Sequence, residues 1–326
     1  MMFIFSLIAL LCWSGSDFFS KVGTRTNDKN SHWKVVFAVG FAMGIHFLIT
    51  LIGGAIINSL PEETIEALPK FVMSLFYTDF VFMDFIRYLP VAGLYIFAMV
   101  IGYIGLRYIE LSVSSPICNG SGAFAFLLCV IFGLTTKEDI TPLAIVGVSL
   151  ITVGVIGLGF VENLEDEEAK LLRREKSNKK YAKSFLAILI PVLYLIIDGI
   201  GTTADEFIFA IEGPTGEGII TDYSANSAFE LTFFLLAIFA FVFLKFVKKD
   251  TVFKGNKHFF FGGICETVGQ IFYMAVIFSD YTVGMVIISA YCAVSVLWGR
   301  IFLKETLSWK HYVAIAVAFA GIVCLG

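Results

Sequence analysis

The chain has 326 residues, of which 58% are hydrophobic and 15% are charged, and its formal net charge is −4. Soluble domains are usually ~45–50% apolar and ~25% charged, so this composition excludes a soluble enzyme, a disordered chain and a nucleic-acid-binding protein. The apolar runs are continuous and do not alternate with polar residues, which also argues against an outer-membrane β-barrel.

Apolar segments follow one another along the chain, and each can cross the ~30 Å apolar core of a bilayer at ~1.5 Å per residue. A chain in lipid must satisfy its own backbone hydrogen bonds, so we expect each segment to be a helix. The sequence therefore predicts an all-α integral membrane protein with ten transmembrane helices. They span approximately 3–20, 32–57, 85–106, 112–134, 140–160, 184–208, 224–247, 258–278, 282–303 and 310–325.

Two stretches between these segments are polar. Residues 161–183 form a charged linker, expected in the cytoplasm, which separates a unit of five predicted helices, 1–160, from a second unit, 184–326. Residues 58–84 are only half polar and predict either an amphipathic turn at the membrane surface or an ordinary surface loop. The apolar residues that favour the turn are Phe71, Val72, Leu75 and Phe76.

Lysine and arginine are distributed unevenly between the two sets of connections. Most of the 23 basic residues lie in or beside the connections that follow the odd-numbered helices. Because basic connections stay in the cytoplasm, we expect a multi-pass protein of the plasma membrane with both termini outside. The residues that remain on the outer side are Lys70, Arg87 and Lys137, with the acidic Glu206, Glu212, Glu217 and Asp222.

The two units match each other weakly but in one order. Residues 103–115 align with 273–285 at an offset of 170. Because each unit has an odd number of predicted helices, the second enters the membrane in the opposite sense, and this predicts an inverted repeat. Inverted repeats are common in transporters, where the substrate site lies between the repeats. At the offset of 170 the aligned pairs include Tyr103 with Tyr273, Glu110 with Asp280 and Ser112 with Thr282. Further along, the offset becomes 167 and pairs Lys137 with Lys304, Glu138 with Glu305 and Gly154 with Gly321. Near the starts of the units it is 181 and pairs Trp13 with Tyr194 and Asp17 with Asp198.

The opening LIALLCWSGSDFFSKVG and the closing ISAYCAVSVLWGRIFLKETLSWKHYVAIAVAFAGI resemble the EamA-like permeases of the drug/metabolite transporter superfamily. The closing stretch has that family's pattern of an apolar helix, a short LKETL link and a last helix that contains glycine. The first-unit counterpart is FAFLLCVIFGLTTKEDITPLAIVGVSLITVGVIG. The resemblance implies a secondary carrier of small metabolites or drugs, with ten helices in two repeats. Many such permeases are drawn with cytoplasmic termini, whereas the basic residues here favour the opposite orientation.

Ionisable side chains within transmembrane helices are costly, at ~2.5–3.5 kcal/mol on insertion scales, and are therefore candidate functional residues. Asp17 and Lys21 are four residues apart on the first predicted helix, with Trp13 one turn earlier on the same face. They predict either an ion pair near the helix end or an aspartate that faces the centre of the protein.

On the sixth predicted helix, Tyr194, Asp198, Thr202 and Asp205 form one polar stripe. Lipid cannot face such a stripe, so it faces protein or water. It predicts either a lining of the substrate site or a structural polar seam.

Glu266 lies in the middle of the eighth predicted helix and shares a face with Gln270 and Tyr273. At the offset of 170, Glu266 aligns with Ile96, so the carboxylate is present in only one of the two units. This asymmetry favours a role in binding a substrate or a proton, because removal from water favours the protonated form of a carboxyl group. The alternative is a buried glutamate that only stabilises its helix.

Other polar residues give weaker indications. Glu230 predicts either an outer vestibule or a boundary charge, and His46 either a core histidine or a proton relay. Asn119 follows Pro116, which has no backbone donor, and so it could line the site or join a tight helix contact. The weakest candidates of this kind are Ser289, Tyr291 and Ser295.

These features predict a secondary active transporter of a small metabolite, amino acid or drug-like molecule that works by alternating access with proton coupling. A sugar uptake porter is an alternative, because Trp13, Asn119, Thr202 and Gln270 could build a neutral hydrogen-bonding site. A lipid-linked flippase is another, although midplane basic residues for a phosphate head group are missing. We expect no enzymatic activity, since HExxH and GxSxG are absent, no metal or cofactor, and a monomer or homodimer in the bilayer.

Overall fold

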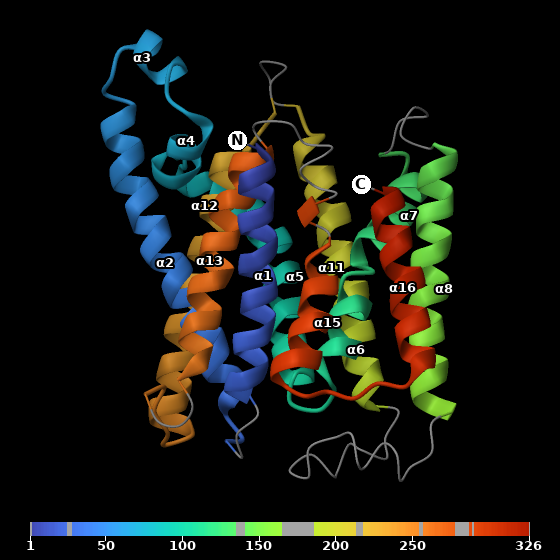
Figure 1. The fold of residues 1–326 in the computed structure, drawn as a ribbon. Helices are drawn as coiled ribbons and strands as arrows, with labels where there is room; N and C mark the ends of the chain where they lie inside the picture. Colours follow the sequence, from blue (N-terminus) through green and yellow to red (C-terminus); the bar gives the residue numbers. More distant parts are fainter. Residues whose placement is uncertain are drawn as a thin grey trace.

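The computed structural model describes residues 2–24, 28–134, 141–164, 186–212, 218–253, 257–277, 287–288 and 290–325. Within these ranges the chain is largely helical, and the long helices run side by side as a bundle (Figure 1). The long helices are α1 (Met2–Thr24), α2 (Ser31–Ile57), α5 (Phe82–Gly105), α8 (Pro142–Leu164), α11 (Leu186–Phe209), α12 (Asp222–Val242, continued by the π-helical turn η2, Phe243–Val247) and α13 (His258–Ile277). An all-α membrane architecture is therefore confirmed.

Eight spans of the described chain are long and apolar enough to cross a membrane. The seven long helices supply one span each, and α6 (Leu111–Cys118) and α7 (Ser121–Phe132) together supply the eighth. The last two apolar helices, α15 (Tyr291–Phe302) and α16 (Trp309–Leu325), are shorter. Most of the first half of the predicted helix 282–303 lies outside the described residues. A total of ten transmembrane helices therefore stays a prediction.

The predicted helix 112–134 is interrupted where α6 gives way to α7. The turn contains Asn119 and Gly120, whose amides donate to the carbonyls of Ser115 and Ile117. Pro116 one turn earlier cannot donate a backbone hydrogen bond, which weakens the helix at this point. The interruption lies inside the bundle, so the polar groups that it frees face protein and not lipid.

The half-polar stretch 58–84 forms two short helices, α3 (Glu62–Glu66) and α4 (Lys70–Phe76). In α4, the ring of Phe71 lies 5.4 Å from that of Phe5 in α1 and 5.1 Å from that of Phe272 in α13. Of the two alternatives, the structure therefore favours the amphipathic turn over the surface loop. The charged linker 161–183 is described only as far as Leu164, where α8 ends, and the remainder lies outside the described residues.

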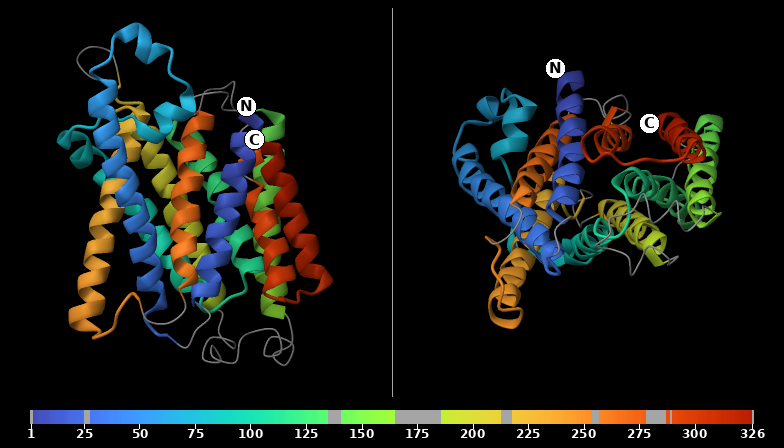
Figure 2. Two further views of the ribbon diagram at one scale, coloured as in Figure 1. Left: turned by 60° about the vertical axis from the view of Figure 1, so that its left-hand side comes forward. Right: turned by 60° about the horizontal axis from the view of Figure 1, so that its bottom comes forward.

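Helices from the two halves of the chain pack against each other in pairs: α1 with α13, α2 with α12, α5 with α11, and α8 with α16. Figure 2 shows these pairs from two further directions. Glycine allows close contacts within these pairs. A Cβ atom on Gly154 of α8 would lie 2.6 Å from Ala318 of α16, and one on Gly321 would lie 2.6 Å from Ile151.

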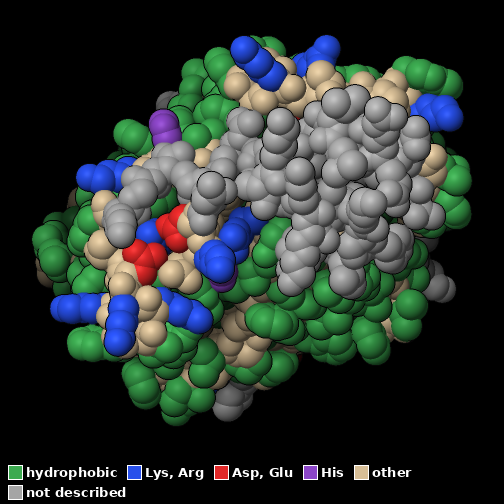
Figure 3. Space-filling view, turned by 90° about the horizontal axis from the view of Figure 1, so that it is seen from below, with side chains coloured by type: hydrophobic (Ala, Val, Ile, Leu, Met, Phe, Trp, Pro, Cys, Tyr) green, Lys and Arg blue, Asp and Glu red, His purple; other side chains and the backbone are tan. Residues whose placement is uncertain are grey.

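The start of α1 and the end of α16 lie at the same end of the bundle, the upper end in Figure 1. The lower end carries the connections from α1 to α2, α5 to α6, α12 to α13 and α15 to α16. Lys and Arg side chains gather around this end in Figure 3. The described basic residues on elements at the lower end are Lys21, Lys29, Lys34, Arg107, Lys245, Lys248, Lys249, Lys257, Arg300, Lys304 and Lys310, against Lys70 and Arg87 at the upper end.

Large apolar side chains cover the outer surface of the bundle. Ile131, Val153 and Phe97, from three different helices, are 72%, 62% and 57% exposed. Exposed apolar side chains distributed around a bundle are expected where lipid replaces water as the solvent. Small side chains occupy the helix contacts inside, as membrane helices require for close packing.

Candidate functional site

Asp17 lies in the interior of the bundle, where α1 meets the broken pair α6–α7 and α15. Its Oδ2 atom accepts hydrogen bonds from Ser115 Oγ at 2.7 Å and from Ser295 Oγ at 2.9 Å. The two serines come from opposite halves of the chain, so Asp17 joins three helices that are far apart in the sequence. This position matches the prediction of an aspartate that faces the centre.

Lys21 does not use Asp17 as its hydrogen-bond acceptor. Its ammonium group donates to the backbone carbonyls of Leu106 at 2.6 Å and Ile109 at 2.8 Å, at the end of α5, and the residue is 5% exposed. The ion pair suggested by the spacing of Asp17 and Lys21 is therefore replaced by two separate sets of contacts. Lys21 donates to backbone carbonyl groups at the end of α5, and Asp17 accepts hydrogen bonds from serine hydroxyls.

Glu266 of α13 lies close to Asp17. The Ser16 hydroxyl contacts the Glu266 carboxylate, and Asp17 is near enough for the two charges to interact. Tyr103 of α5 lies within electrostatic range of both carboxylates. Its hydroxyl is buried and has no hydrogen-bond partner among the described residues. The centre therefore contains two carboxyl groups and one phenol whose hydroxyl is left for a further partner.

Aromatic rings cover one side of these carboxylates. The Trp13 ring lies 5.1 Å from that of Tyr273 in α13 and 5.9 Å from that of Tyr291 in α15. Gly269 allows this arrangement, since a Cβ atom there would lie 2.5 Å from Trp13 Cδ1. The indole Nε1 of Trp13 is buried without a partner among the described residues, so a second donor is also available.

The polar stripe on α11 is divided between two surroundings. Asp198 contacts Ser121 of α7. Tyr194 lies within electrostatic range of both Asp198 and Glu266. Tyr194 packs where Gly102 of α5 leaves space, 2.9 Å from an added Cβ atom. Thr202 Oγ1 donates to the Asp198 carbonyl at 3.1 Å. This part of the stripe faces the centre as a lining would.

The last member of the stripe belongs to a different contact. Asp205 accepts a hydrogen bond from Tyr88 of α5 at 2.8 Å, and Tyr95 Oη lies 3.5 Å from its other oxygen. Asp205 thus ties α11 to α5, as a structural seam would. Asn119 occupies the turn that follows α6, and its amide closes that helix on Ser115. Ser289 lies outside the described residues.

The structure also shows a polar chain that the sequence did not predict. Gln270 Nε2 donates to Asn226 Oδ1 at 2.9 Å, and Asn226 Nδ2 donates to Glu230 Oε1 at 3.2 Å. Glu230 Oε1 also lies 2.7 Å from His46 Nδ1. His46 and Glu230 are 184 positions apart, so each looked isolated in its own helix. No spacing rule within one helix could have joined them.

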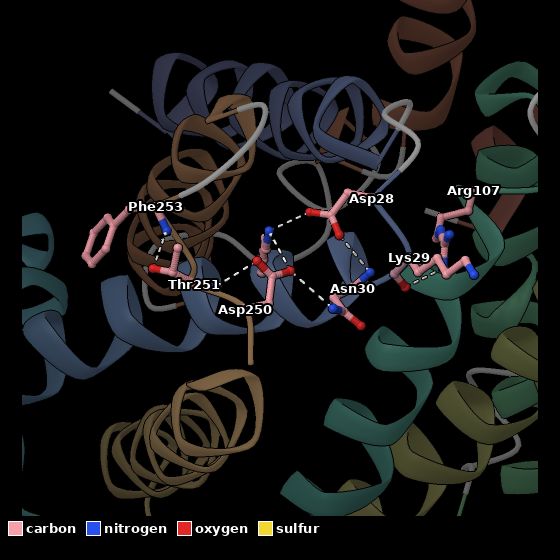
Figure 4. A network of polar contacts seen from close by, with 8 residues as sticks. Asp28, Lys29, Asn30, Arg107, Asp250, Thr251 and Phe253 are labelled. Atoms are coloured by element: carbon pink, nitrogen blue, oxygen red, sulfur yellow. Dashed lines mark hydrogen bonds and ion pairs between the residues drawn. The ribbon is translucent and has the colours of Figure 1, made fainter. Parts of the chain in front are cut away.

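A second polar network holds the lower end together (Figure 4). Lys34 is 2% exposed and pairs with Asp28 at 2.5 Å and with Asp250 at 3.1 Å. Asn30 also donates to Asp250, at 3.1 Å. Burial acts to raise the pKa of Asp250, but hydrogen bonds from Asn30, the Thr251 amide and Lys34 outweigh it and hold this pKa below its ordinary value. The network ties the start of α2 to the connection between α12 and α13.

Among the described residues, no group of three or more His, Cys, Asp and Glu side chains is placed to hold a metal ion. The central carboxylates are held by serine hydroxyls and adjoin tyrosine rings. Such a centre suits protons, cations or hydrogen-bonding ligands.

Part of the chain matches a known protein family. Residues 204–326 match the EamA-like transporter family. This stretch begins near the end of α11 and includes α12, α13, α15 and α16. The search of curated proteins found no significant match. The family match is consistent with a permease of the drug/metabolite transporter superfamily, and together with the apolar helices it indicates a membrane transporter.

Proposed function

We propose that the chain is a secondary active transporter with ten transmembrane helices, and that it binds its substrate at the Asp17–Glu266 centre. The observation that carries this proposal is the convergence of carboxyl groups from α1, α11 and α13 on one interior region, with aromatic rings beside them. Such groups are costly in a membrane and are kept where they bind ions, protons or substrates.

The packing of the helices supports an inverted repeat. In an inverted repeat, the first five predicted helices correspond in order to the last five, so α1 corresponds to α11 and α5 corresponds to α13. The contact between α1 and α13 should then have a counterpart between α11 and α5, and both contacts are present. The pairs α2–α12 and α8–α16 each join two helices that correspond to one another, so each pair is its own counterpart. In the last pair, Gly154 faces Ala318 and Gly321 faces Ile151, which is symmetrical at the offset of 167. Halves related in this way can rock about a central site and expose it to each side in turn.

The chemistry of the centre favours a cationic or zwitterionic substrate. Asp17, Asp198 and Glu266 supply negative charge, and Lys21 is held apart by backbone carbonyls. Trp13 and Tyr273 present rings that attract organic cations, while Trp13 Nε1 and the Tyr103 hydroxyl can donate to an acceptor group. A substrate with an amine and an acceptor, such as an amino acid, would satisfy both.

A sugar porter is the second candidate, because Gln270 and Asn226 form a neutral amide pair beside the centre. A lipid-linked flippase receives less support, since the described basic residues lie at the ends of the bundle. We infer that the protein resides in the plasma membrane, with the basic end in the cytoplasm and both termini outside, as a monomer or homodimer without enzymatic activity.

The test is uptake by the purified protein in liposomes that contain a trapped pH-sensitive dye. Labelled leucine, tetraethylammonium and glucose serve as probes. We expect uptake of leucine or tetraethylammonium in exchange for protons, and a loss of at least ~tenfold in Glu266→Gln, which corresponds to ~1.4 kcal/mol. Glu62→Gln on the exposed helix α3 is the control and should transport normally. Uptake of glucose alone would support the sugar porter, and uptake of no probe would overturn the transport proposal.

A further inference from the structure

The pair formed by His46 and Glu230 is the most deeply buried charged contact outside the Asp17–Glu266 centre. His46 Nδ1 and Glu230 Oε1 are 2.7 Å apart, and their side chains are 4% and 0% exposed. His46 comes from α2 and Glu230 from α12, so each half of the chain contributes one partner. A motion of one half against the other would change this contact directly.

Neutral amide groups connect the pair to the Asp17–Glu266 centre. Glu230 accepts from Asn226, and Asn226 accepts from Gln270, which lies one turn after Glu266 on α13. The pair is therefore close enough to respond to events at the centre but is separated from it by two uncharged side chains. This separation allows a proton and a substrate to occupy different places.

One oxygen of the pair is left without a hydrogen bond. Glu230 Oε2 is buried and has no partner among the described residues. A carboxylate confined in this way is unfavourable unless its charge is compensated. When His46 is protonated the pair has no net charge, and when His46 is neutral the pair carries one negative charge that the surroundings solvate poorly.

We propose that His46 and Glu230 form the proton-binding site that couples transport to a pH gradient, separate from the carboxylates that bind substrate. This inference rests on the proposed transport function. A proton from water on one side joins the imidazole, whose Nδ1–H donates to Glu230 Oε1, and this takes the pair from a charge of −1 to zero. When the halves rearrange and water reaches the pair from the other side, the imidazole returns that proton to water.

The surroundings of the pair place no second charge on the imidazole. Within the described residues, Glu230 is the charged group that acts on His46, and α4 faces the ring with the backbone of Leu75. The ionisable groups of the other neighbouring helices are engaged elsewhere. On α5, Asp84 and Arg87 bind each other, and Tyr88 donates to Asp205. On α1, Asp17 binds serine hydroxyls and Lys21 binds backbone carbonyls. On α13, Glu266 contacts the Ser16 hydroxyl.

The first test observes the proton without a substrate. The protein has four histidines, so nitrogen-15 NMR of histidine-labelled protein in lipid nanodiscs can follow each ring between about pH 5 and pH 8. We expect the His46 signals, assigned with His46→Gln, to change over this range in the wild type and not in Glu230→Gln. His258→Gln, at an exposed position, is the control. His46 signals that are unaffected by Glu230→Gln would overturn the proposed site.

The second test separates coupling from transport. The wild type, His46→Gln and Glu230→Gln are compared in liposomes at zero membrane potential, with whichever of leucine and tetraethylammonium the wild type exchanges in counterflow. A gradient of one pH unit supports ~tenfold accumulation for one proton per molecule. We expect this accumulation in the wild type and its loss in both variants, while counterflow continues. Glu230→Asp keeps a carboxylate and should recover part of the accumulation.

The outcomes distinguish the two proposals. Normal gradient-driven accumulation by Glu230→Gln would overturn the coupling site and leave the transport function intact. The absence of counterflow in the wild type would overturn the transport function, and the coupling inference with it. A loss of counterflow in both variants, with unchanged thermal unfolding and no recovery in Glu230→Asp, would assign the pair to substrate binding and overturn its separate role.

Discussion

At the scale of single residues, the contacts of Asp17 and Lys21 show how partners from other helices separate two neighbouring side chains. Asp17 and Lys21 are neighbours on one helix face, but one binds serine hydroxyls and the other binds carbonyls at the end of α5. The spacing placed both side chains on one helix face and left open an ion pair or an aspartate that faces the centre. It could not predict their partners, because these lie 85 to 278 positions away in the sequence.

The contact between Trp13 and Gly269 predicts the effect of adding a single methyl group at position 269. A Cβ atom on Gly269 would meet Trp13 at 2.5 Å, so Gly269→Ala must displace the indole from between Tyr273 and Tyr291. Overpacking of this kind costs ~1–3 kcal/mol. We expect a lower midpoint of thermal unfolding in detergent and altered tryptophan fluorescence.

Gly93→Ala is the matched control for that substitution. Gly93 also lies within a helix, but an added Cβ atom there would have no neighbour within 4 Å. Because alanine is the better helix former by ~0.5–1 kcal/mol, Gly93→Ala should leave stability unchanged or raise it. Equal effects of the two substitutions would show that the indole is free to move aside.

At the scale of helices, the connection between α15 and α16 is attached to the start of α6. The Glu305 carboxylate accepts the amides of Leu111 and Ser112, each at 2.9 Å, and the Ser112 hydroxyl at 2.6 Å. The first amides of a helix have no partners within it, and its dipole favours a negative charge at that end. Glu305 therefore acts as a cap supplied from the other half of the chain.

Removal of this cap should weaken the contact between the halves. We expect Glu305→Ala to lower the free energy of unfolding by ~1–3 kcal/mol, because it leaves buried amides unsatisfied, and Glu305→Gln to cost less. Thermal unfolding of the purified protein measures both, with Glu62→Ala on the exposed helix α3 as the control. A stability equal to that of the wild type in Glu305→Ala would contradict the capping role.

The ion network at the lower end predicts a dependence on pH. The pKa of Asp250 is held below its ordinary value of 3.8, so its contribution to stability is present above that value and is lost as the pH falls through the lower, folded-state pKa. We expect Asp250→Asn to remove part of the acid sensitivity of unfolding below about pH 4. An identical pH profile in the variant and the wild type would show that the network does not hold this end.

The boundaries of the helices could be predicted much better than their contacts. Continuous apolar runs are sufficient to predict α2 or α13, because lipid enforces helical hydrogen bonding wherever such runs occur. The sequence predicted one helix over 112–134, and its interruption between α6 and α7 near Pro116 depends on the helices packed around it. The pairing of His46 with Glu230 is a property of the packed bundle and has no counterpart in either segment alone.

At the scale of the whole molecule, the contact between α8 and α16 tests whether the two halves act as one unit. Gly154 lets these helices approach, whereas Gly159, on the same helix, has no neighbour within 4 Å of an added Cβ atom. Gly154→Leu should therefore separate the halves and lower the unfolding midpoint, and Gly159→Leu should not. The same loss in both variants would show that leucine at any position disturbs α8.

The orientation of the molecule in the membrane follows from the distribution of charge. The described basic residues gather at the end of the bundle opposite the start of α1 and the end of α16. Short basic connections remain in the cytoplasm, so both termini should lie outside. In a bacterial host, alkaline phosphatase fused after Gly326 should be active and green fluorescent protein at that position should be dark, with the reverse for insertions in the 161–183 linker. Fluorescence at the C-terminus would place the basic end outside and would require a source of orientation other than the lysine and arginine residues.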